Sequence, residues 1–171
     1  MMINPFAKKY TVEESKIFQF LSKIPVFGGL SNKELAEFIP SMHERSYKQN
    51  ECVFLRNDPS HAMYIVKTGE VVLSIDIEGA TEELRRITGG NAIGKSCLLP
   101  NTKRQMNAIV SSEKAEFYVI PQVNFLDIFN HKPNIHVKMM SALAKEYNKY
   151  NANLFKAYRK YYGIFELKHL Y

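Results

Sequence analysis

Short β-prone segments separated by turns fill residues 43–120, and this pattern constrains the fold more than any other feature of the chain. Runs rich in β-branched and aromatic residues occur at 52–56, 61–67, 69–76, 105–112 and 115–121. Strands that recur at intervals of roughly 8 to 12 residues are typical of an antiparallel sandwich or jelly roll. Because no long helical segments alternate with them, a parallel sheet is not expected. Thr68-Gly69 is interpreted as a tight hairpin turn between two strands, and Glu78-Gly79 as a second turn.

Helical patterns flank this strand-rich region on both sides. The segments that begin at Thr11 and Ser31 each have a glutamate three residues later, which is the spacing of a capping box at a helix start. Apolar residues follow both caps at helical spacing. After the strands, residues 122–129 are expected to form a short helix, and Pro133 is suited to the first turn of a long one.

These patterns predict an α+β fold, in which an antiparallel β-roll (a double-stranded jelly roll) has N-terminal helices and a long C-terminal helix. At 171 residues the chain is long enough to bury a core of its own. We expect three parts: an N-terminal helical segment at 1–19, the roll at 20–130, and a basic C-terminal helix at 131–171.

Positive charge is concentrated at the C-terminal end of the chain. The net charge is +6, and residues 131–171 account for all of it, with eight Lys and Arg against two Glu. Residues 1–130 balance at 15 residues of each sign. Such a segment favours an acidic protein or a nucleic acid as partner, although a solvated helix face is the simpler interpretation.

Apolar and aromatic residues recur along the expected long helix at spacings close to three and four. They are Val137, Met140, Ala144, Tyr147, Leu154, Tyr158 and Tyr161. A stripe of this kind either forms the seam of a coiled coil or packs across the body of its own chain. We expect a homodimer that forms through this helix.

The composition is that of a soluble globular protein, with 46% hydrophobic and 23% charged residues. No apolar run approaches the roughly 18 residues that cross a membrane, and the N-terminus lacks the apolar core of a signal peptide. A cytoplasmic location without a membrane partner is therefore expected. The two cysteines, Cys52 and Cys97, are too few and too far apart for a metal or cluster framework.

Residues 89–105 contain a phosphate-binding pattern. Gly89 with Gly94-Lys95-Ser96 matches the G-x-x-x-x-G-K-[ST] loop of nucleotide triphosphatases. That loop needs a buried parallel strand before it and a stable helix after it. Residues 82–88 are too polar for such a strand, and Pro100 interrupts the following segment within about one turn. We therefore expect the match to be accidental.

The order of helix, strand-rich region, short helix and long helix resembles the cyclic-nucleotide-binding domain of the Crp-Fnr family. The resemblance covers roughly residues 20–150. It is carried by the segments IPVFGGLSNKELAEFIPSM and NECVFLRNDPSHAMYIVKTGEVVLSI, and residues 58–71 are its most specific part. The resemblance implies a β-roll with a regulatory function and no catalytic activity.

The same resemblance implies a phosphate cassette, a term used here for residues 93–106. Ile93-Gly94-Lys95 lies where the family has Phe-Gly-Glu, so Lys95 replaces the glutamate that binds the ribose hydroxyl. Gln105 aligns with the arginine that pairs with the cyclic phosphate, and Arg104 is one residue away. The candidate ligand-binding residues are therefore Ile93, Gly94, Lys95, Ser96, Cys97, Arg104, Gln105 and Met106.

These substitutions alter the chemistry of the expected pocket. A lysine only donates hydrogen bonds, and Gln105 offers a neutral amide in place of an arginine fork. Lys95, Arg104 and Lys103 still supply positive charge that favours an anion. The ligand is therefore expected to be a cyclic nucleotide or another small anion, with cyclic AMP not held in the family's usual way.

We expect a non-enzymatic sensory or regulatory module that signals through its long helix. About ten residues follow Tyr161, too few for the helix-turn-helix domain that the family's transcription factors carry there. One alternative is a protein without a ligand that binds an acidic partner through its basic helix. Less favoured are a P-loop-type nucleotide binder and a metal-dependent cupin-type enzyme. A cupin needs clustered ligands, whereas His43 and His61 are isolated. The remaining histidines, His131, His136 and His169, lie in the C-terminal segment.

Overall fold

The structure, a computed structural model, describes residues 10–162. The predicted features that involve residues 1–9 and 163–171, His169 among them, lie outside this range. Six helical elements and eight strands make up the described chain. The helices are α1 (Val12–Leu21), α2 (Asn32–Leu35), the 3-10 helix η1 (Ile39–Ser41), α3 (Gln122–His131) and α4 (Pro133–Tyr162), with a second 3-10 helix, η2 (Lys95–Leu98), between strands. The strands are β1 (His43–Lys48), β2 (Cys52–Phe54), β3 (Ala62–Thr68), β4 (Glu70–Ile77), β5 (Ala80–Thr88), β6 (Asn91–Ile93), β7 (Asn107–Val110) and β8 (Lys114–Pro121).

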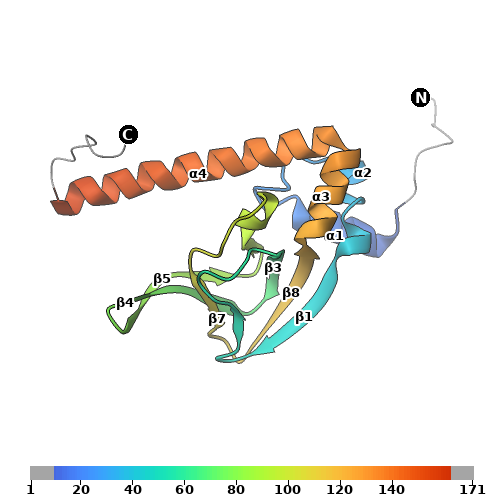
Figure 1. The fold of residues 1–171 in the computed structure, drawn as a ribbon. Helices are drawn as coiled ribbons and strands as arrows, with labels where there is room; N and C mark the ends of the chain where they lie inside the picture. The colour runs from blue at the N-terminus through green and yellow to red at the C-terminus, as the bar shows by residue number, and fades with distance from the viewer. Residues whose placement is uncertain (1–9, 163–171) are drawn as a thin grey trace, which may run out of the picture.

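The eight strands form two four-stranded antiparallel sheets, in the orders β1-β8-β3-β6 and β2-β7-β4-β5. Figure 1 shows the N-terminal helices and α3 at one end of these sheets, with α4 running across the top. The predicted α+β roll is therefore confirmed. Consecutive strands alternate between the two sheets, and β4 and β5 are the single consecutive pair that shares a sheet.

This alternation corrects one predicted turn. Thr68-Gly69 is not a hairpin turn, because β3 and β4 belong to different sheets. Gly69 has a φ of 84°, and a Cβ at this position would overlap the Lys114 carbonyl oxygen, so the crossing requires glycine. The turn at Glu78-Gly79 is confirmed: both residues have positive φ and join β4 to β5 as a hairpin.

Both predicted capping boxes are present. The Thr11 hydroxyl accepts from the Glu14 amide at 3.1 Å, and the Glu14 carboxylate accepts from the Thr11 amide at 2.7 Å. Ser31 and Glu34 make the same reciprocal pair. Each box satisfies two backbone N–H groups that would otherwise be unpaired at the start of the helix. This explains why both helices begin where the sequence predicts.

Three strands, β1, β5 and β6, lie outside the predicted runs. Strand β5 is at the edge of its sheet, and Ile87 is its one buried residue. Arg86 on this strand pairs with Glu70 at 2.8 Å and with Glu83 at 2.7 Å. An edge strand that is exposed along most of its length has no apolar alternation, so β-propensity alone misses it.

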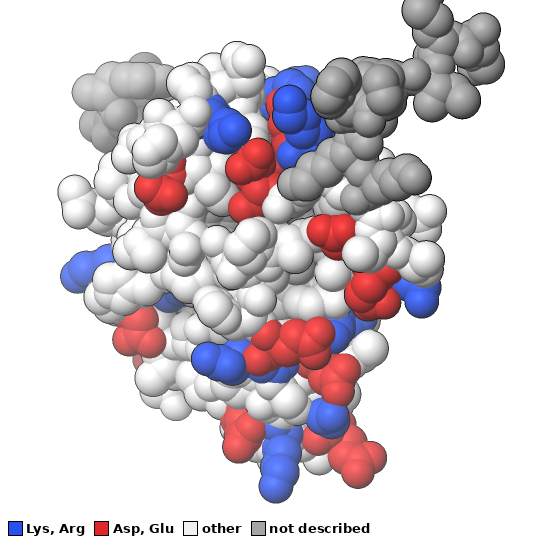
Figure 2. Space-filling model, turned by 90° about the vertical axis from the view of Figure 1, so that its right-hand side faces the viewer, with Lys and Arg blue, Asp and Glu red and all other residues white. Residues whose placement is uncertain are grey.

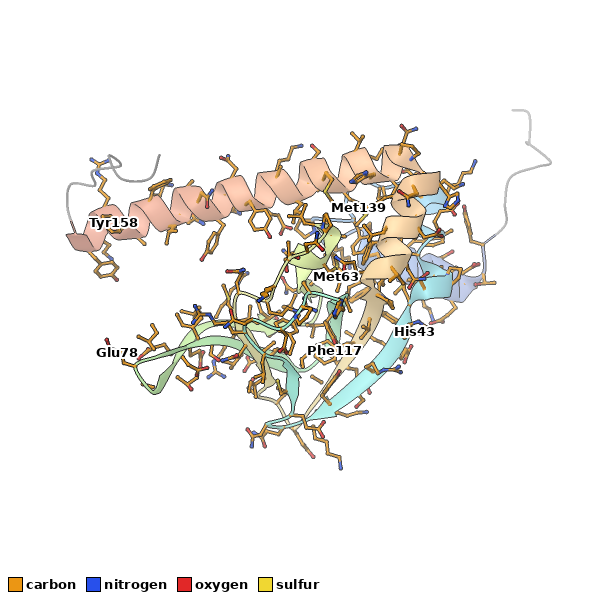
Figure 3. The ribbon with its side chains drawn as sticks, viewed as in Figure 1. His43, Met63, Glu78, Phe117, Met139 and Tyr158 are labelled. Carbon is orange, nitrogen blue, oxygen red and sulfur yellow. The ribbon has the colours of Figure 1, made fainter. Side chains whose placement is uncertain are left out.

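Two apolar clusters hold the fold together. The first fills the interior of the roll between the sheets and includes Val66, Val71 and Phe117. The second joins the helices to the roll and contains Met63 of β3 and Met139 of α4, which Figure 3 shows at the junction of these elements. Because residues of α1, α2, η2 and α3 belong to the same second cluster, the helical elements share a core with one face of the roll.

The long helix α4 packs through a different face from the predicted stripe. Its buried residues are Ile135, Met139 and Leu143, at a spacing of four. From residue 147 to residue 161 every described side chain is exposed. Figures 1 and 3 show this C-terminal half of α4 extending beyond the body, with Tyr158 near its end.

The stripe residues on this extension are exposed and large. Tyr147 is 45% exposed, Leu154 is 55% exposed, and Tyr161 is 74% exposed. The stripe from Tyr147 onward therefore does not pack across the roll, whereas Met140 packs against the second cluster. A homodimer through the stripe stays a prediction. On the face of the body drawn in Figure 2, acidic and basic side chains are interspersed, in keeping with the balanced charge of residues 1–130.

Candidate functional site

The phosphate cassette begins at the end of β6 and passes through η2 to β7. Gly94, at the start of η2, has a φ of 72°, a left-handed conformation that favours glycine. The Gln122 side chain at the start of α3 donates to the Cys97 carbonyl at 2.7 Å and to the Leu99 carbonyl at 3.0 Å. The cassette is therefore held between the β6 end of one sheet and the first turn of α3.

Arg104 is the central charged group of the cassette. Its side chain is 4% exposed, and its guanidinium lies over the Phe54 ring at 4.2 Å. Arg104 Nη1 donates to the Gly94 carbonyl at 3.0 Å, and Nη2 donates to the Ala62 carbonyl at 2.7 Å. Nε is buried and has no hydrogen-bond partner within residues 10–162. Burial lowers the pKa of Arg104 from its usual value.

Backbone hydrogen bonds fix Arg104 in this inward position. The Arg104 amide donates to the Asp58 carbonyl at 2.8 Å, and its carbonyl accepts from the Asn57 amide at 2.9 Å. Asn57 has a φ of 70°, which marks a tight turn between β2 and β3. The Asp58 carboxylate stabilises that turn by accepting from the Leu55 amide at 2.9 Å. The turn therefore positions Arg104, and it belongs to the segment that resembles the family most specifically.

Lys95 turns away from Arg104 toward the long helix. Its ammonium donates to Glu146 Oε1 of α4 at 2.7 Å, and the two side chains are 29% and 27% exposed. The second oxygen of this carboxylate, Oε2, is buried and has no hydrogen-bond partner in the described chain. This ion pair links the cassette directly to α4.

The other predicted site residues occupy three kinds of position. Ile93 and Cys97 are buried in the two apolar clusters, and burial raises the pKa of the Cys97 thiol to about 12. Ser96 lies 2.9 Å from the Ser60 hydroxyl, in a hydrogen bond that either group can donate. Met106 is half-buried. Their roles in ligand binding stay predictions.

Arg104, and not Gln105, is the cassette residue that points inward. Gln105 is exposed, and its amide donates to the Lys103 carbonyl at 3.3 Å. The alignment that placed Gln105 at the position of the family's arginine therefore does not match the direction of these two side chains. If the alignment is shifted by one residue, Arg104 takes the position of the family's arginine, and its guanidinium donates to the carbonyl of the cassette glycine, Gly94.

The structure around Gly89 differs from that of a triphosphatase loop. The preceding strands β5 and β6 are antiparallel to their neighbours, and η2 has four residues. Gly89 has a different role, because a Cβ there would lie 2.7 Å from the Lys67 carbonyl oxygen. It permits the close approach of two backbones where the chain crosses from one sheet to the other.

Three groups of this site were not predicted from the sequence. Phe54 and the Ala62 carbonyl, which contact Arg104, come from predicted strands, but nothing in the sequence indicated that these strands face Arg104. Glu146 is the third, and it lies 51 residues from Lys95. One available signal was that Glu146 is one of two acids in the basic segment 131–171.

Residues 10–162 contain no group of three or more His, Cys, Asp or Glu side chains that could hold a metal ion. No helix within the same range has the length and apolarity that a membrane crossing requires.

The roll, the inward arginine and the glycine-led cassette are the features that a cyclic-nucleotide-binding type of domain is expected to have. Comparison with known families agrees: the family model for the cyclic nucleotide-binding domain matches residues 44–132. This chain therefore belongs to the cyclic nucleotide-binding domain family. The matched residues include most of the roll, the turn at Asn57 and Asp58, and the phosphate cassette.

Similar proteins come from several functional classes. The chain is 26% identical over 122 residues to the cyclic AMP receptor protein of Thermus thermophilus, which covers 71% of this chain and 56% of that protein. It is 25% identical over 113 residues to the cGMP-dependent protein kinase egl-4 of Caenorhabditis elegans, which covers 65% of this chain and 14% of the kinase. The chain thus spans between about one seventh and just over half of these two relatives.

Solved structures share the fold. The Thermus thermophilus catabolite activator protein superimposes with a TM-score of 0.66 at 22% identity, over 78% of this chain and 62% of that one. The N-terminal domain of a transcriptional regulator from Streptomyces coelicolor superimposes with a TM-score of 0.69 at 21% identity, over 79% of this chain and 94% of that one. The resemblance to Crp-Fnr-type domains is therefore confirmed for the fold.

Proposed function

We propose that this protein is a non-enzymatic, cytoplasmic regulatory module that binds a phosphate-bearing small ligand beside Arg104 and signals through α4. The observation that carries this proposal is the buried guanidinium with an unpaired Nε. A buried donor without a partner costs free energy, and a phosphate oxygen would satisfy it with a charge-assisted hydrogen bond.

The pocket is atypical for a cyclic nucleotide. Lys95 stands where the family has a glutamate, and it pairs with Glu146. A ribose hydroxyl therefore lacks its usual carboxylate acceptor, and we expect cyclic AMP and cyclic GMP to bind weakly. Part of the affinity that remains comes from Arg104.

The route of the signal is proposed from packing. The cassette contacts α3 through Gln122, and α3 precedes α4 by one residue. The Lys95–Glu146 ion pair reaches α4 directly. A ligand that moved η2 would therefore change how the N-terminal half of α4 packs, and the exposed half would transmit this change.

We further propose that the exposed half of α4 pairs with a second copy of the chain. Every described side chain from residue 147 to residue 161 is exposed, so this half of α4 gains little from packing on the roll, which is where most helical stability in proteins comes from. Tyr147, Tyr150, Leu154 and Tyr161 recur at the spacing of a coiled-coil seam. A partner helix would stabilise this segment and bury the aromatic side chains.

Calorimetry with cyclic AMP, cyclic GMP and inorganic phosphate, on the wild-type chain and on Arg104→Ala, tests the ligand proposal. A hydrogen bond to a charged group contributes about 1.5 to 3 kcal/mol, so Arg104→Ala should weaken binding by about one to two orders of magnitude. Hydrogen exchange of residues 130–160 should differ between the free and the ligand-bound protein. Binding that is unaffected by Arg104→Ala, or exchange that stays identical, contradicts the proposal.

The alternative function is a ligand-free interaction protein that binds an acidic partner through its basic helix. Lys156, Arg159 and Lys160 are exposed on the extension of α4, which favours this alternative. Charge reversal at these three positions should then abolish capture of an acidic partner, and pocket variants such as Arg104→Ala should have no effect. The reverse outcome supports the ligand-binding module.

A further inference from the structure

The two buried polar atoms without partners in the described chain flank the same short helix. Arg104 Nε belongs to the group that donates to Gly94, immediately before η2. Glu146 Oε2 belongs to the carboxylate that holds Lys95, the first residue of η2. The site therefore has two cationic side chains, one from each end of the cassette: Arg104 has an unpaired donor, and Lys95 is paired with a carboxylate that has one oxygen left unpaired.

Lys95 determines what a ligand must offer at this position. To contact a ligand, its ammonium must leave a carboxylate that it holds at 2.7 Å in a largely buried pair. A neutral hydroxyl returns a weaker hydrogen bond than the charge-assisted one that is lost. An anionic group returns a bond of the same kind. The exchange therefore favours a ligand with a negative charge at this end over one with a neutral hydroxyl.

We propose that the natural ligand carries two anionic groups: a phosphate that Arg104 binds, and a second anion that Lys95 binds in exchange for Glu146. This inference rests on the proposed function, because it assumes that Arg104 holds a phosphate. It identifies the ligand class as a doubly anionic phosphorylated molecule, in contrast to a cyclic mononucleotide with a free ribose hydroxyl.

The carboxylate that this exchange releases has another partner within reach. Lys149 follows Glu146 by three residues on α4, a spacing at which a helix brings opposite charges together, and its side chain is exposed. Lys149 and Glu146 line the same groove beside Pro25 and Gly29. Lys149 can therefore pair with the released Glu146, and the release breaks the direct link between the cassette and α4.

Two probes that differ in one anionic group test this inference. Cyclic AMP carries a single negative charge, and 2′-O-succinyl cyclic AMP adds a carboxylate at the ribose position that faces the replaced glutamate in the family. Titration calorimetry on the full chain should give at least tenfold tighter binding of the succinyl ester. Lys95→Gln should remove this preference, and Glu146→Gln, which leaves Lys95 unpaired, should strengthen binding of the ester several-fold.

The outcomes separate this inference from the proposed function. Equal binding of the two probes, or tighter binding of cyclic AMP, overturns the doubly anionic ligand but leaves the phosphate site intact if Arg104→Ala still weakens binding. A preference for the ester that survives Lys95→Gln also overturns it. If neither probe binds at concentrations up to about 1 mM, which corresponds to about −4 kcal/mol, the proposed function itself fails. Hydrogen exchange at residues 143–158 should increase more with the ester than with cyclic AMP.

Discussion

Arg104 and Gly94 are mutually dependent. The guanidinium donates to the Gly94 carbonyl at 3.0 Å, and a Cβ on Gly94 would overlap Arg104 Nη1. The left-handed φ of Gly94 also disfavours any residue with a side chain. Glycine at this position therefore permits both the turn into η2 and the burial of the arginine.

Gly94→Ala should destabilise the protein more than a left-handed φ alone explains. The left-handed backbone conformation should lower the free energy of unfolding by about 1 to 2 kcal/mol. Displacement of the Arg104 guanidinium should lower it further, because hydrogen bonds of a charged group are lost. Urea denaturation gives the free energy of unfolding. Gly90→Ala is the matched control, because Gly90 has a φ of 81° and open space around it. Equal losses in the two variants would show that the contact with Arg104 contributes nothing.

One of the two cysteines should react with a thiol reagent in the folded protein. Cys52 is exposed, whereas Cys97 is buried and has its pKa raised to about 12 by burial, so almost no thiolate forms at pH 8. Titration with a disulfide reagent at pH 8 should detect one thiol in the native chain and two in denaturant. Cys52→Ser should leave no fast-reacting thiol. Rapid reaction of Cys97 in that variant would contradict its burial.

Stability should decrease in acid in a way that depends on Glu34. Hydrogen bonds from Lys138 and from the Ser31 backbone lower the pKa of Glu34 below its ordinary value of 4.5. The stabilisation is therefore complete above that value and is lost as the pH falls through the lowered pKa. Urea midpoints measured across this pH range should show the loss in the wild-type chain.

Two variants divide this effect between its causes. Glu34→Gln should flatten the acid-side decrease by removing the titrating group. Lys138→Ala removes the 2.8 Å ion pair but keeps the capping box with Ser31, so it should remove only part of the decrease. An unchanged pH profile in Glu34→Gln would assign the acid sensitivity to other groups.

Self-association should depend on one face of the α4 extension. Leu154→Glu places a charge in the middle of the exposed stripe, so it should convert a dimer to a monomer in sedimentation velocity. Ala152→Glu adds the same charge on the opposite side of the same exposed segment and should leave the dimer intact. A wild-type chain that sediments as a monomer at all concentrations would refute the homodimer.

Local signals predicted the boundaries of the fold well. The capping boxes at Thr11 and Ser31 depend on residues three positions apart, so the sequence contains the whole interaction. The buried strands β3 and β8 were recognisable because most of their residues are apolar. Strand β5 was missed because its residues are polar on both faces.

Tertiary relations were harder to predict. The residues at Thr68-Gly69 fit a hairpin, and only the partners of β3 and β4 show that the chain crosses between sheets there. The direction of Arg104 depends on backbone hydrogen bonds to the turn at Asn57 and Asp58, about 46 residues earlier in the chain. The sequence drew attention to Lys95 in the cassette, but its partner Glu146 is set by how α4 packs.

The alternation of strands between the two sheets has a consequence for biosynthesis. The first strand, β1, pairs along its whole length with the last, β8, so that His43 lies opposite Val119. Pairing two strands that lie so far apart in the sequence requires the closure of a long loop, which is costly. Folds dominated by such long-range pairs form slowly. The local hairpin β4–β5 has one buried residue on β5, Ile87, so the apolar residues of β4 need the rest of the roll to bury them. A nascent chain on the ribosome therefore cannot complete the roll until Pro121 has emerged, and chaperones would meet its apolar segments exposed until then.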